Sequence, residues 1–210
     1  MGIPVGSHRV KLIVGLLSND IAAMEKAGSA LKSIFGQTDF ESGILDFTHS
    51  DYYRDEMGSG LKRKFLSFRK LLDLKDIYKV KLRTNRLEIK FLSLGRRRVN
   101  IDPGYLDHAK LVLFSTKDYV HRIYLNKGIY AEVTLYYKDK SFNAWPWTYP
   151  DYKSGGYIEI FNSIRELYTS TAPACASKDA SKDAPLSISR KLMKNLGIHT
   201  IALHALRRGS

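Results

Sequence analysis

The sequence has a single cysteine, Cys175, among its 210 residues. One thiol cannot build an internal disulfide framework, which excludes the class of small disulfide-stapled secreted proteins. It also excludes zinc sites made from CxxC pairs. A free thiol fits a reducing compartment, so we expect the protein to be cytoplasmic.

Long apolar runs are also absent. The longest early uncharged run, Leu12 to Asn19, is far shorter than the roughly 20 apolar residues that cross a bilayer. No positively charged and then apolar segment typical of a signal peptide is visible. The sequence therefore predicts no membrane span.

Familiar chemical signatures are missing as well. The candidate for a phosphate loop, Gly58 to Lys62, lacks the G-x-x-x-x-G-K-[ST] spacing and leads into a basic strand instead of a helix. There is no Rossmann fingerprint and no HExxH zinc motif. If the protein binds a nucleotide, it must do so by another architecture.

The sequence does have an excess of positive charge. The formal net charge is +13, and the segment from Arg54 to Arg98 carries 15 Lys or Arg against 5 Asp or Glu. Such a basic segment attracts phosphate-bearing partners. A solvated basic face that only keeps a protein soluble has the same composition, so both interpretations stay open.

Hydrophobic periodicity predicts a β-then-α beginning. An apolar strand at Val10 to Leu17 precedes a helix that ends near Gly36. The segment 61–72 is predicted to be a second long strand with its basic residues on exposed positions. Asp73 can then cap a helix that reaches about Leu92.

The later segments indicate a β-meander over Val120 to Phe142 and a helix from about Gly156 to Tyr168 that closes the core. We therefore expect an α+β fold with a mainly antiparallel sheet and helices mostly on one face. The beginning is expected to be ferredoxin-like, and the meander to extend that sheet.

The composition changes after Tyr168. Residues 169–187 are a low-complexity linker in which ASKD is repeated in tandem, and residues 188–210 form a basic, potentially helical extension. We expect residues 1–168 to form a single domain. The extension either contacts a membrane surface or a partner, or has no role.

A tight turn fixes the register of the meander. If Asn126 to Gly128 is a three-residue loop, Arg122 faces Glu132 on one side of the hairpin and His121 lies on the other side. A structural cross-strand salt bridge explains the pair, and so does a carboxylate that holds an arginine for a ligand phosphate.

Polar residues also interrupt the helix after Asp73. Lys81, Asn85 and Glu88 follow one another at spacings of four and three residues, so they form one row, with Asn85 among the buried positions. One interpretation is an exposed face with a single core amide. The other is that the row lines the same cavity as Asp102.

Asp102 stands before a Pro-Gly pair, which predicts a turn that presents its carboxylate at the edge of the sheet. Burying it or its charged neighbours in the run from Gly95 to Tyr137 without partners would be costly, so a polar site is predicted there. The candidate catalytic residues are Asp102, Glu132 and His121, with His121 the weakest because of its face. The candidate ligand-binding residues are Lys81, Asn85, Glu88, Arg97, Arg98, Tyr105, Arg122 and Trp147.

No cofactor can be assigned from the sequence. The six histidines are scattered and show no zinc spacing, so no metal site is predicted. An oxygen-rich Mg²⁺ site at Asp102 and Glu132 is the alternative. The aromatic segment from Trp145 to Tyr152 either stacks on a base or sugar or forms a lid over the core.

Several blocks of the sequence together resemble the prokaryotic domain-of-unknown-function 4416 family over about Val10 to Tyr168. These blocks are VKLIVGLLS, DFTHSDYYRDEMGSGLKRKFLSF, KLRTNRLE, RRRVNIDPGYL, KLVLFSTKDYVHRIYL, GIYAEVTL and WTYPDY. The resemblance implies no established activity. The family's motif positions that match are Asp51, Tyr52, Tyr53, Asn85, Glu88, Asp102, Gly104, Tyr105, His121, Arg122 and Glu132.

The leading functional expectation is binding of a phosphate-bearing ligand, a nucleotide or RNA, at the cluster of Arg, Lys, Asp and Glu side chains. A phosphoester-type hydrolase is the first alternative, with Asp102 or His121 as base and Glu132 orienting Arg122. A non-catalytic protein-interaction module is the second, and its protein partner is unknown.

Overall fold

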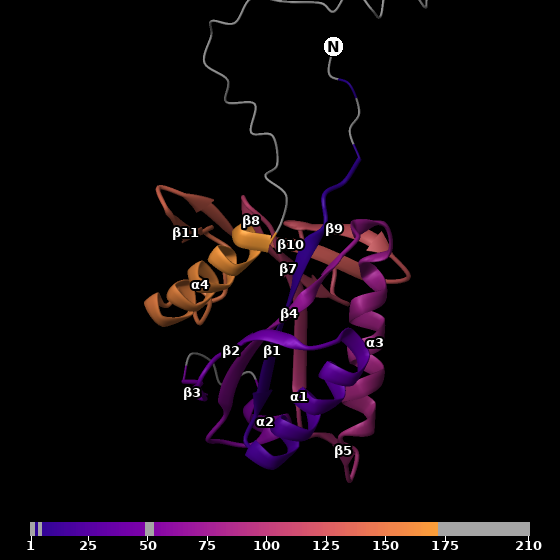
Figure 1. Cartoon of the computed structure of the whole chain (residues 1–210). Coiled ribbons are helices and arrows are strands. Elements are labelled where there is room, and N and C mark those ends of the chain that lie inside the picture. The colour runs from indigo at the N-terminus through magenta and orange to yellow at the C-terminus, as the bar shows by residue number, and fades with distance from the viewer. Residues whose placement is uncertain (1–2, 4–5, 49–52, 172–210) are drawn as a thin grey trace, which may run out of the picture. The chain divides into compact units, whose positions relative to one another are not determined.

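A nine-stranded antiparallel sheet organises the described part of the chain in this computed structural model (Figure 1). The structure describes residues 3, 6–48 and 53–171. The strands of this sheet are β1 (Val10–Ser18), β2 (Thr38–Glu41), β3 (Leu45–Asp46), β4 (Lys62–Leu72), β7 (Asn100–Leu106), β8 (Lys110–Ser115), β9 (Arg122–Asn126), β10 (Ile129–Lys138) and β11 (Ser141–Ala144). A separate two-stranded sheet pairs β5 (Leu92–Ser93) with β6 (Arg96–Arg97). The helices are α1 (Ile21–Phe35), α2 (Arg54–Met57), the 3₁₀ helix η1 (Leu74–Asp76), α3 (Tyr78–Lys90) and α4 (Gly155–Thr171).

The first half of the sheet is ferredoxin-like, as expected. The elements β1, α1, β2, β4, α3 and β7 follow one another along the chain, and their strands lie in the order β7-β1-β4-β2. This is the split βαβ arrangement, and it confirms the α+β expectation. Strands β8, β9, β10 and β11 extend the sheet beyond β7, which places the predicted meander there.

Strand β1 lies in the interior of the sheet, between β7 and β4, and all of its residues are buried. Its even-numbered residues from Val10 to Leu16 pack in one cluster with residues of α1 and α3, whereas Ile13 packs in another with residues of α4. This alternation follows from the two-residue period of a strand. Helices α1 and α3 therefore cover one face of the sheet, and α4 covers the other.

The turn predicted at Asp102 is wrong, because β7 continues straight through Pro103 and Gly104. A side chain at position 104 has no room, since its Cβ would lie 2.2 Å from the carbonyl oxygen of Val112 in β8. The pairing of β7 with β8 begins only at Gly104, so the ladder on that side needs no N–H from Pro103. The Pro-Gly pair therefore lies inside a central strand and does not end it.

The helix predicted after Asp73 begins later than expected. Asp73 caps the 3₁₀ turn η1, accepting a hydrogen bond from the Lys75 amide at 2.9 Å, and α3 starts at Tyr78. Leu74 of the predicted buried stripe therefore belongs to the 3₁₀ turn and not to the α-helix. The buried residues of α3 are Val80, Lys81, Thr84 and Leu87, so the predicted stripe is wrong at Asn85, which is only half-buried, and at Ile89, which is exposed.

The β9–β10 hairpin keeps the predicted register but uses a different turn. Lys127 and Gly128, with φ of 48° and 73°, form a two-residue turn, and an irregularity next to Ile129 restores the register. Arg122 faces Glu132, which confirms that predicted pair. The predicted loop had three residues and the observed turn has two. The extra residue lies in the bulge instead, so the pairing beyond the bulge is the same.

Helix α4 extends three residues beyond its predicted end at Tyr168. The rest of the linker prediction, residues 172–187, and the whole predicted extension, residues 188–210, lie outside the described residues. In the part of the chain that is described, no helix combines the length and hydropathy needed to cross a membrane.

Candidate functional site

A cavity of about 650 Å³ opens beside the ends of β4, β7, β8 and β10. The loop between β8 and β9 and the loop before α4 complete its wall. The predicted site residues that line it are Lys81, Arg97, Asp102, His121, Arg122, Glu132 and Trp147. Their convergence requires the sheet, because they come from helix α3, strands β6, β7, β9 and β10, and two loops.

The deepest cation of the cavity is Arg63 of β4, which is 2% exposed. Its Nη1 donates to Asp102 Oδ2 at 2.9 Å, and its Nη2 donates to Asp151 Oδ2 at 3.2 Å. The guanidinium carbon also lies 5.3 Å from the centre of the Phe47 ring. Two carboxylates and an aromatic face compensate this buried charge.

Asp102 belongs to a longer chain of hydrogen bonds. Asn100 Nδ2 donates to Asp102 Oδ2 at 2.7 Å, and Asn100 Oδ1 accepts from Arg97 Nη1 at 2.5 Å. Arg97 in turn holds both carboxylate oxygens of Glu56, at 3.0 Å and 2.5 Å. We call this chain the floor network; its members are Glu56, Arg97, Asn100, Asp102, Arg63 and Asp151.

The two aspartates of the floor network differ in acidity. Burial alone would raise the pKa of Asp102, but the charges of Arg63 and Lys81 and the hydrogen bonds to its carboxylate hold that pKa below its ordinary value. Burial raises the pKa of Asp151 despite the nearby Arg63 charge. Asp102 is therefore ionised at neutral pH and suits the acceptor role better than the role of a general base.

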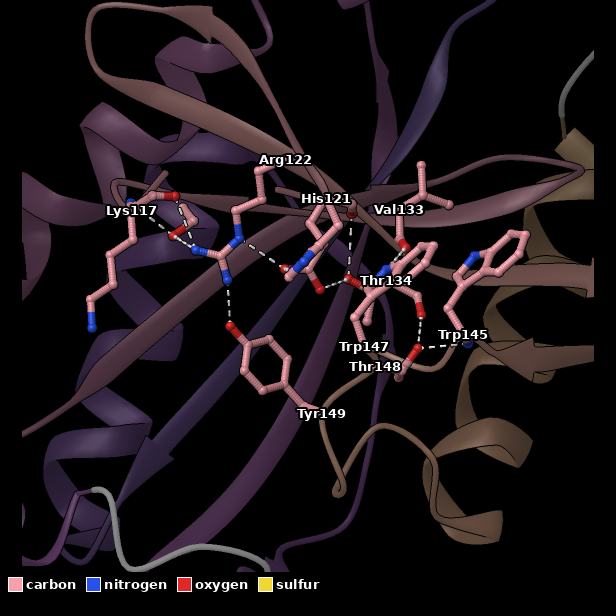
Figure 2. A network of polar contacts seen from close by, with 11 residues as sticks. Lys117, His121, Arg122, Val133, Thr134, Trp145, Trp147, Thr148 and Tyr149 are labelled. Carbon is pink, nitrogen blue, oxygen red and sulfur yellow. Dashed lines mark hydrogen bonds and ion pairs between the residues drawn. The ribbon is translucent and has the colours of Figure 1, made fainter. Parts of the chain in front are cut away.

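A second network forms the wall of the cavity, and Figure 2 shows it. Glu132, 2% exposed, accepts from Arg122 Nε at 2.9 Å through Oε2. Arg122 Nη1 donates to Ser115 Oγ and to the Lys117 carbonyl oxygen, both at 3.0 Å. Its Nη2 donates to the Tyr149 hydroxyl at 2.5 Å. We call Arg122, Glu132, His121, Ser115, Lys117 and Tyr149 the wall network.

The wall network leaves Arg122 little capacity for a ligand. An arginine has five N–H donors, and the bonds described above use four of them. Arg122 therefore holds the β8–β9 loop and the loop before α4 against β10. This is a positioning role more than the phosphate-binding role expected from the sequence.

His121 faces the cavity, although the hairpin register predicted the opposite side. The prediction is wrong because β9 begins only at Arg122, so strand alternation does not apply to the turn residue before it. His121 Nε2 lies 3.2 Å from Glu132 Oε2. Its ring stacks on Tyr119 and on Trp147, with centroid distances of 6.0 Å and 5.6 Å.

Aromatic side chains surround the cavity opening. Trp147 is 40% exposed and donates from Nε1 to the Val133 carbonyl oxygen at 3.2 Å, which fixes its ring (Figure 2). Its other stacking partner is Trp145, at a centroid distance of 5.1 Å. We call the four aromatic residues that line this opening the aromatic rim: Tyr119, His121, Trp147 and Tyr149.

Lys81 and Glu88 of α3 share a structural task at Ile101 of β7. Lys81 Nζ donates to the Ile101 carbonyl oxygen at 3.0 Å, and Glu88 Oε1 accepts from the Ile101 amide at 2.5 Å. Burial raises the pKa of Glu88, and the nearby Lys81 charge opposes the rise. Lys81 lines the cavity, but Glu88 does not.

Asn85, Arg98 and Tyr105 are not brought to the cavity. Asn85 lies half-buried on α3, because the buried face of that helix carries Val80, Lys81, Thr84 and Leu87 instead of the predicted stripe. Arg98 pairs with Asp20 at the beginning of α1. Tyr105 belongs to the core, where it contacts Phe114 at a centroid distance of 6.0 Å and burial raises its pKa to about 12.

Sequence reasoning missed Arg63 and Asp151. It placed the basic residues of the strand 61–72 on exposed positions, which is wrong for Arg63. Strand alternation carried the signal, because Arg63 lies between the buried residues Leu61 and Phe65. No comparable signal marks Asp151, since the loop that carries it has no periodicity.

The residues of the cavity do not fit a magnesium site at Asp102 and Glu132. Both oxygens of Glu132 already accept hydrogen bonds, Oε2 from Arg122 at 2.9 Å and Oε1 from Thr134 at 3.4 Å. Throughout residues 6–48 and 53–171, no group of three or more His, Cys, Asp or Glu side chains could hold a metal ion.

Ion pairs neutralise part of the positive charge of the basic segment from Arg54 to Arg98. Between described residues, six of its 15 cations pair with carboxylates: Lys62 with Asp46, Arg63 with Asp102 and Asp151, Lys64 with Glu25 and Glu41, Lys79 with Asp76, Arg97 with Glu56, and Arg98 with Asp20. Most of these acidic partners lie outside the segment. The local charge excess therefore overstates the field that a partner would meet.

The comparisons with known proteins return a family match. The model of a family described as Domain of unknown function (DUF4416) matches residues 8–168. This range contains every member of the floor and wall networks. No curated protein and no solved structure matches the chain.

Proposed function

The chain belongs to the DUF4416 family, a domain of unknown function, and we propose from the geometry of its cavity that it binds a phosphate-bearing small ligand with a planar ring, of the nucleotide type. The observation that carries the proposal is the joining of cationic donors and exposed aromatic rings around one cavity of nucleotide size. Hydrogen-bond capacity, ring exposure and volume each support it.

Lys81 and Arg97 supply the donors for a phosphate group. Arg97 uses three of its N–H groups for Glu56 and Asn100, and Lys81 uses one for Ile101. Five N–H groups on arginine and three on lysine leave each side chain two donors, counting partners among the described residues. Charge-assisted hydrogen bonds from such donors are the strong contacts of phosphate sites.

The aromatic rim suits a planar ring. Tyr119 and Tyr149 are 57% and 44% exposed, so each keeps surface for a ligand. Trp147 is 40% exposed, but its ring is already stacked on His121 and on Trp145. Stacking of a base on an aromatic side chain contributes about 1–3 kcal/mol. The polar floor and aromatic opening together favour a ligand that has both a charged group and a flat ring.

The size of the cavity supports a single nucleotide over an RNA strand. Its volume of about 650 Å³ falls in the ordinary range of small-molecule sites. The ion pairs within the basic segment also weaken the case for an extended RNA surface. We place this binding activity in the cytoplasm, because the single cysteine fits a reducing compartment.

The same geometry supports binding more than hydrolysis. The pKa of Asp102 is lowered, which makes its carboxylate a weak general base. Glu132 and His121 engage each other at 3.2 Å, and Glu132 is also bound by Arg122. These contacts hold the Glu132 and His121 side chains in place without a ligand, which suits binding better than hydrolysis.

Isothermal titration calorimetry with nucleoside 5′-monophosphates and 5′-triphosphates tests the proposal. Arg97 and Arg98 are adjacent, and each is ion-paired, but only Arg97 lines the cavity. We expect Arg97→Gln to weaken nucleotide binding by about tenfold or more, the loss typical of charge-assisted hydrogen bonds. Arg98→Gln should change the affinity by less than about twofold.

The proposal fails if the wild-type protein binds none of these nucleotides at millimolar concentration. It also fails if Arg98→Gln weakens binding as much as Arg97→Gln does, since the ligand would then respond to surface charge and not to the cavity.

A further inference from the structure

One carboxylate oxygen of the floor network is left open to the cavity. Asp102 Oδ2 accepts from Arg63 at 2.9 Å and from Asn100 at 2.7 Å, whereas the described residues give Oδ1 no hydrogen bond. The Asp102 side chain is 27% exposed, and the residue lines the cavity. We infer that this oxygen accepts a hydrogen bond from a sugar hydroxyl, and hence that the ligand is a ribonucleotide. The inference rests on the proposed nucleotide-binding function.

The position of Asp102 is fixed before any ligand arrives. Its backbone is part of the central strand β7, where it pairs with Gly15 of β1. The two donors to its other oxygen, Arg63 and Asn100, are themselves 2% and 3% exposed. A group held in this way gives up little conformational freedom when it binds a ligand.

The surroundings of Asp102 select a neutral hydrogen-bond donor. Arg63, Lys81 and Arg97 all line the cavity with it, so a cationic group of a ligand would meet repulsion. A metal ion lacks the ligands it would need among the described residues. A hydroxyl group donates to a carboxylate and carries no charge, so it satisfies both conditions.

The floor network also places this acceptor near the proposed phosphate donors. Asn100 accepts from Arg97 and donates to Asp102, so the phosphate donor and the hydroxyl acceptor are separated by a single side chain. A ligand that uses both must carry hydroxyl groups close to its phosphate. Ribose 5′-phosphate has this arrangement, and carboxylates recognise ribose hydroxyls in other nucleotide-binding folds.

Tyr152 provides a second observation at the same place. It is 3% exposed and lines the cavity, and its hydroxyl has no hydrogen-bond partner among the described residues. Gly15 of β1 is the residue that pairs with Asp102. A Cβ atom added to Gly15 would lie 3.4 Å from the Tyr152 hydroxyl oxygen and 3.2 Å from Arg63 Nη1, so both side chains approach the backbone opposite Asp102. A buried hydroxyl without a partner is unfavourable, and a second hydroxyl of a bound ribose would relieve it.

The test is a comparison of ribonucleotides with their deoxy forms by titration calorimetry on the full chain. The probes are adenosine, guanosine, cytidine and uridine 5′-monophosphates and the corresponding 2′-deoxy and 3′-deoxy compounds. For each ribonucleotide that binds, we expect at least one deoxy form to bind on the order of 10- to 100-fold more weakly, the effect of losing a hydrogen bond to a charged group.

Asp102→Asn should weaken this discrimination. Arg63 and Asn100 both donate to one oxygen of residue 102, so the amide must turn its oxygen toward them and present its NH₂ group to the cavity. A ribose hydroxyl can still accept from that NH₂ group, but the hydrogen bond is then neutral and weaker than the bond to a carboxylate, so the ratio of ribo to deoxy affinities should fall. The control is Asp76→Asn, which removes an exposed carboxylate that is not a cavity residue and should preserve the ratio.

The outcomes separate the inference from the function on which it rests. Nucleotide binding with equal affinity for ribo and deoxy forms overturns the inference alone, and so does discrimination that is undiminished in Asp102→Asn. No nucleotide binding at all overturns both. If Asp102→Asn does not fold, the wild-type comparison decides.

Discussion

Gly15 shows how much the floor of the cavity depends on a single residue without a side chain. Its Cβ would lie 3.2 Å from Arg63 Nη1 and 3.2 Å from Phe65 Cε1. Those contacts are closer than ordinary van der Waals distances, so a methyl group would push Arg63 away from its two carboxylates. The missing side chain makes room for a buried cation.

We predict that Gly15→Ala lowers the free energy of unfolding by about 1–3 kcal/mol, the usual cost of overpacking. Urea denaturation followed by circular dichroism measures this. Gly28→Ala is the matched control, because Gly28 is a buried helical glycine whose Cβ would meet nothing closer than 3.9 Å. It should raise the free energy of unfolding by about 0.5–1 kcal/mol. Equal effects of the two changes would contradict this description of the floor.

Single residues also show how far sequence reasoning reaches. Asp102 and Glu132 attract notice because a charge inside an apolar run needs a partner. Arg63 could have been found by the same rule, combined with strand alternation between Leu61 and Phe65. Asp151 could not, because it reaches Arg63 across 88 positions of the chain and from an aperiodic loop.

Helix α3 replaces a missing strand at one point of the sheet. Strand β8 pairs with β7 only from Gly104 to Leu106, which leaves the backbone of Ile101 without a partner on that side. Lys81 and Glu88 supply the donor and the acceptor instead. The cavity exists because a helix, and not another strand, completes this edge of β7.

Substitutions at Glu88 test that replacement. Glu88→Leu leaves the buried Ile101 amide without an acceptor and should lower the free energy of unfolding by about 1–3 kcal/mol. Glu88→Gln keeps an acceptor oxygen and should cost less. The Ile101 amide should exchange its hydrogen faster in the leucine variant than in the glutamine variant. Identical exchange rates would show that Glu88 does not hold this amide.

The elements that sequence patterns predicted well are those with a long, uninterrupted period. The strand at Val10 to Leu17 and the helix after it are examples, and the hairpin register that pairs Arg122 with Glu132 is another. The predicted turn at Asp102 failed because Pro-Gly usually ends a strand. Here the close approach of β8 requires Gly104, which only the folded sheet reveals.

Across the whole molecule, ion pairs connect elements that are distant in sequence. Glu41 of β2 accepts from Lys32 of α1 and lies within ion-pair distance of Lys64 of β4, at 2.6 Å and 3.2 Å. Burial alone would raise the pKa of Glu41, but hydrogen bonds from Lys32, Thr38 and Lys64 lower it to about 2. This carboxylate therefore links stability to pH.

The direction of that link follows from the two pKa values. Between pH 4.5, the ordinary value for Glu41, and about 2, the unfolded chain binds a proton that the folded chain does not. Stability from Glu41 is fully present above this window and is lost as the pH falls through it. Urea denaturation from pH 6 to pH 2.5 should show a shallower acid decline for Glu41→Gln than for the wild type. Parallel curves would contradict the lowered pKa.

The α+β class could be predicted from the sequence, but the candidate site could be predicted only in part. Alternation and capping identify strands and helices one at a time, whereas the cavity depends on the order β8-β7-β1-β4 in the sheet. That order brings Arg63 and Asp102 to one floor from strands that are both neighbours of β1. Sheet order arises from long-range pairing, which local patterns do not encode.

The central claim is that the cavity bounded by the floor network, the wall network and the aromatic rim binds a nucleotide. The protein has two tryptophans, and only Trp147 lines the cavity, so their indole N–H signals in a ¹H–¹⁵N NMR spectrum report on it directly. Titration with adenosine or guanosine 5′-monophosphate should shift the Trp147 signal progressively to saturation, with a smaller shift at Trp145. A Trp147 signal that stays in place throughout the titration would contradict the claim.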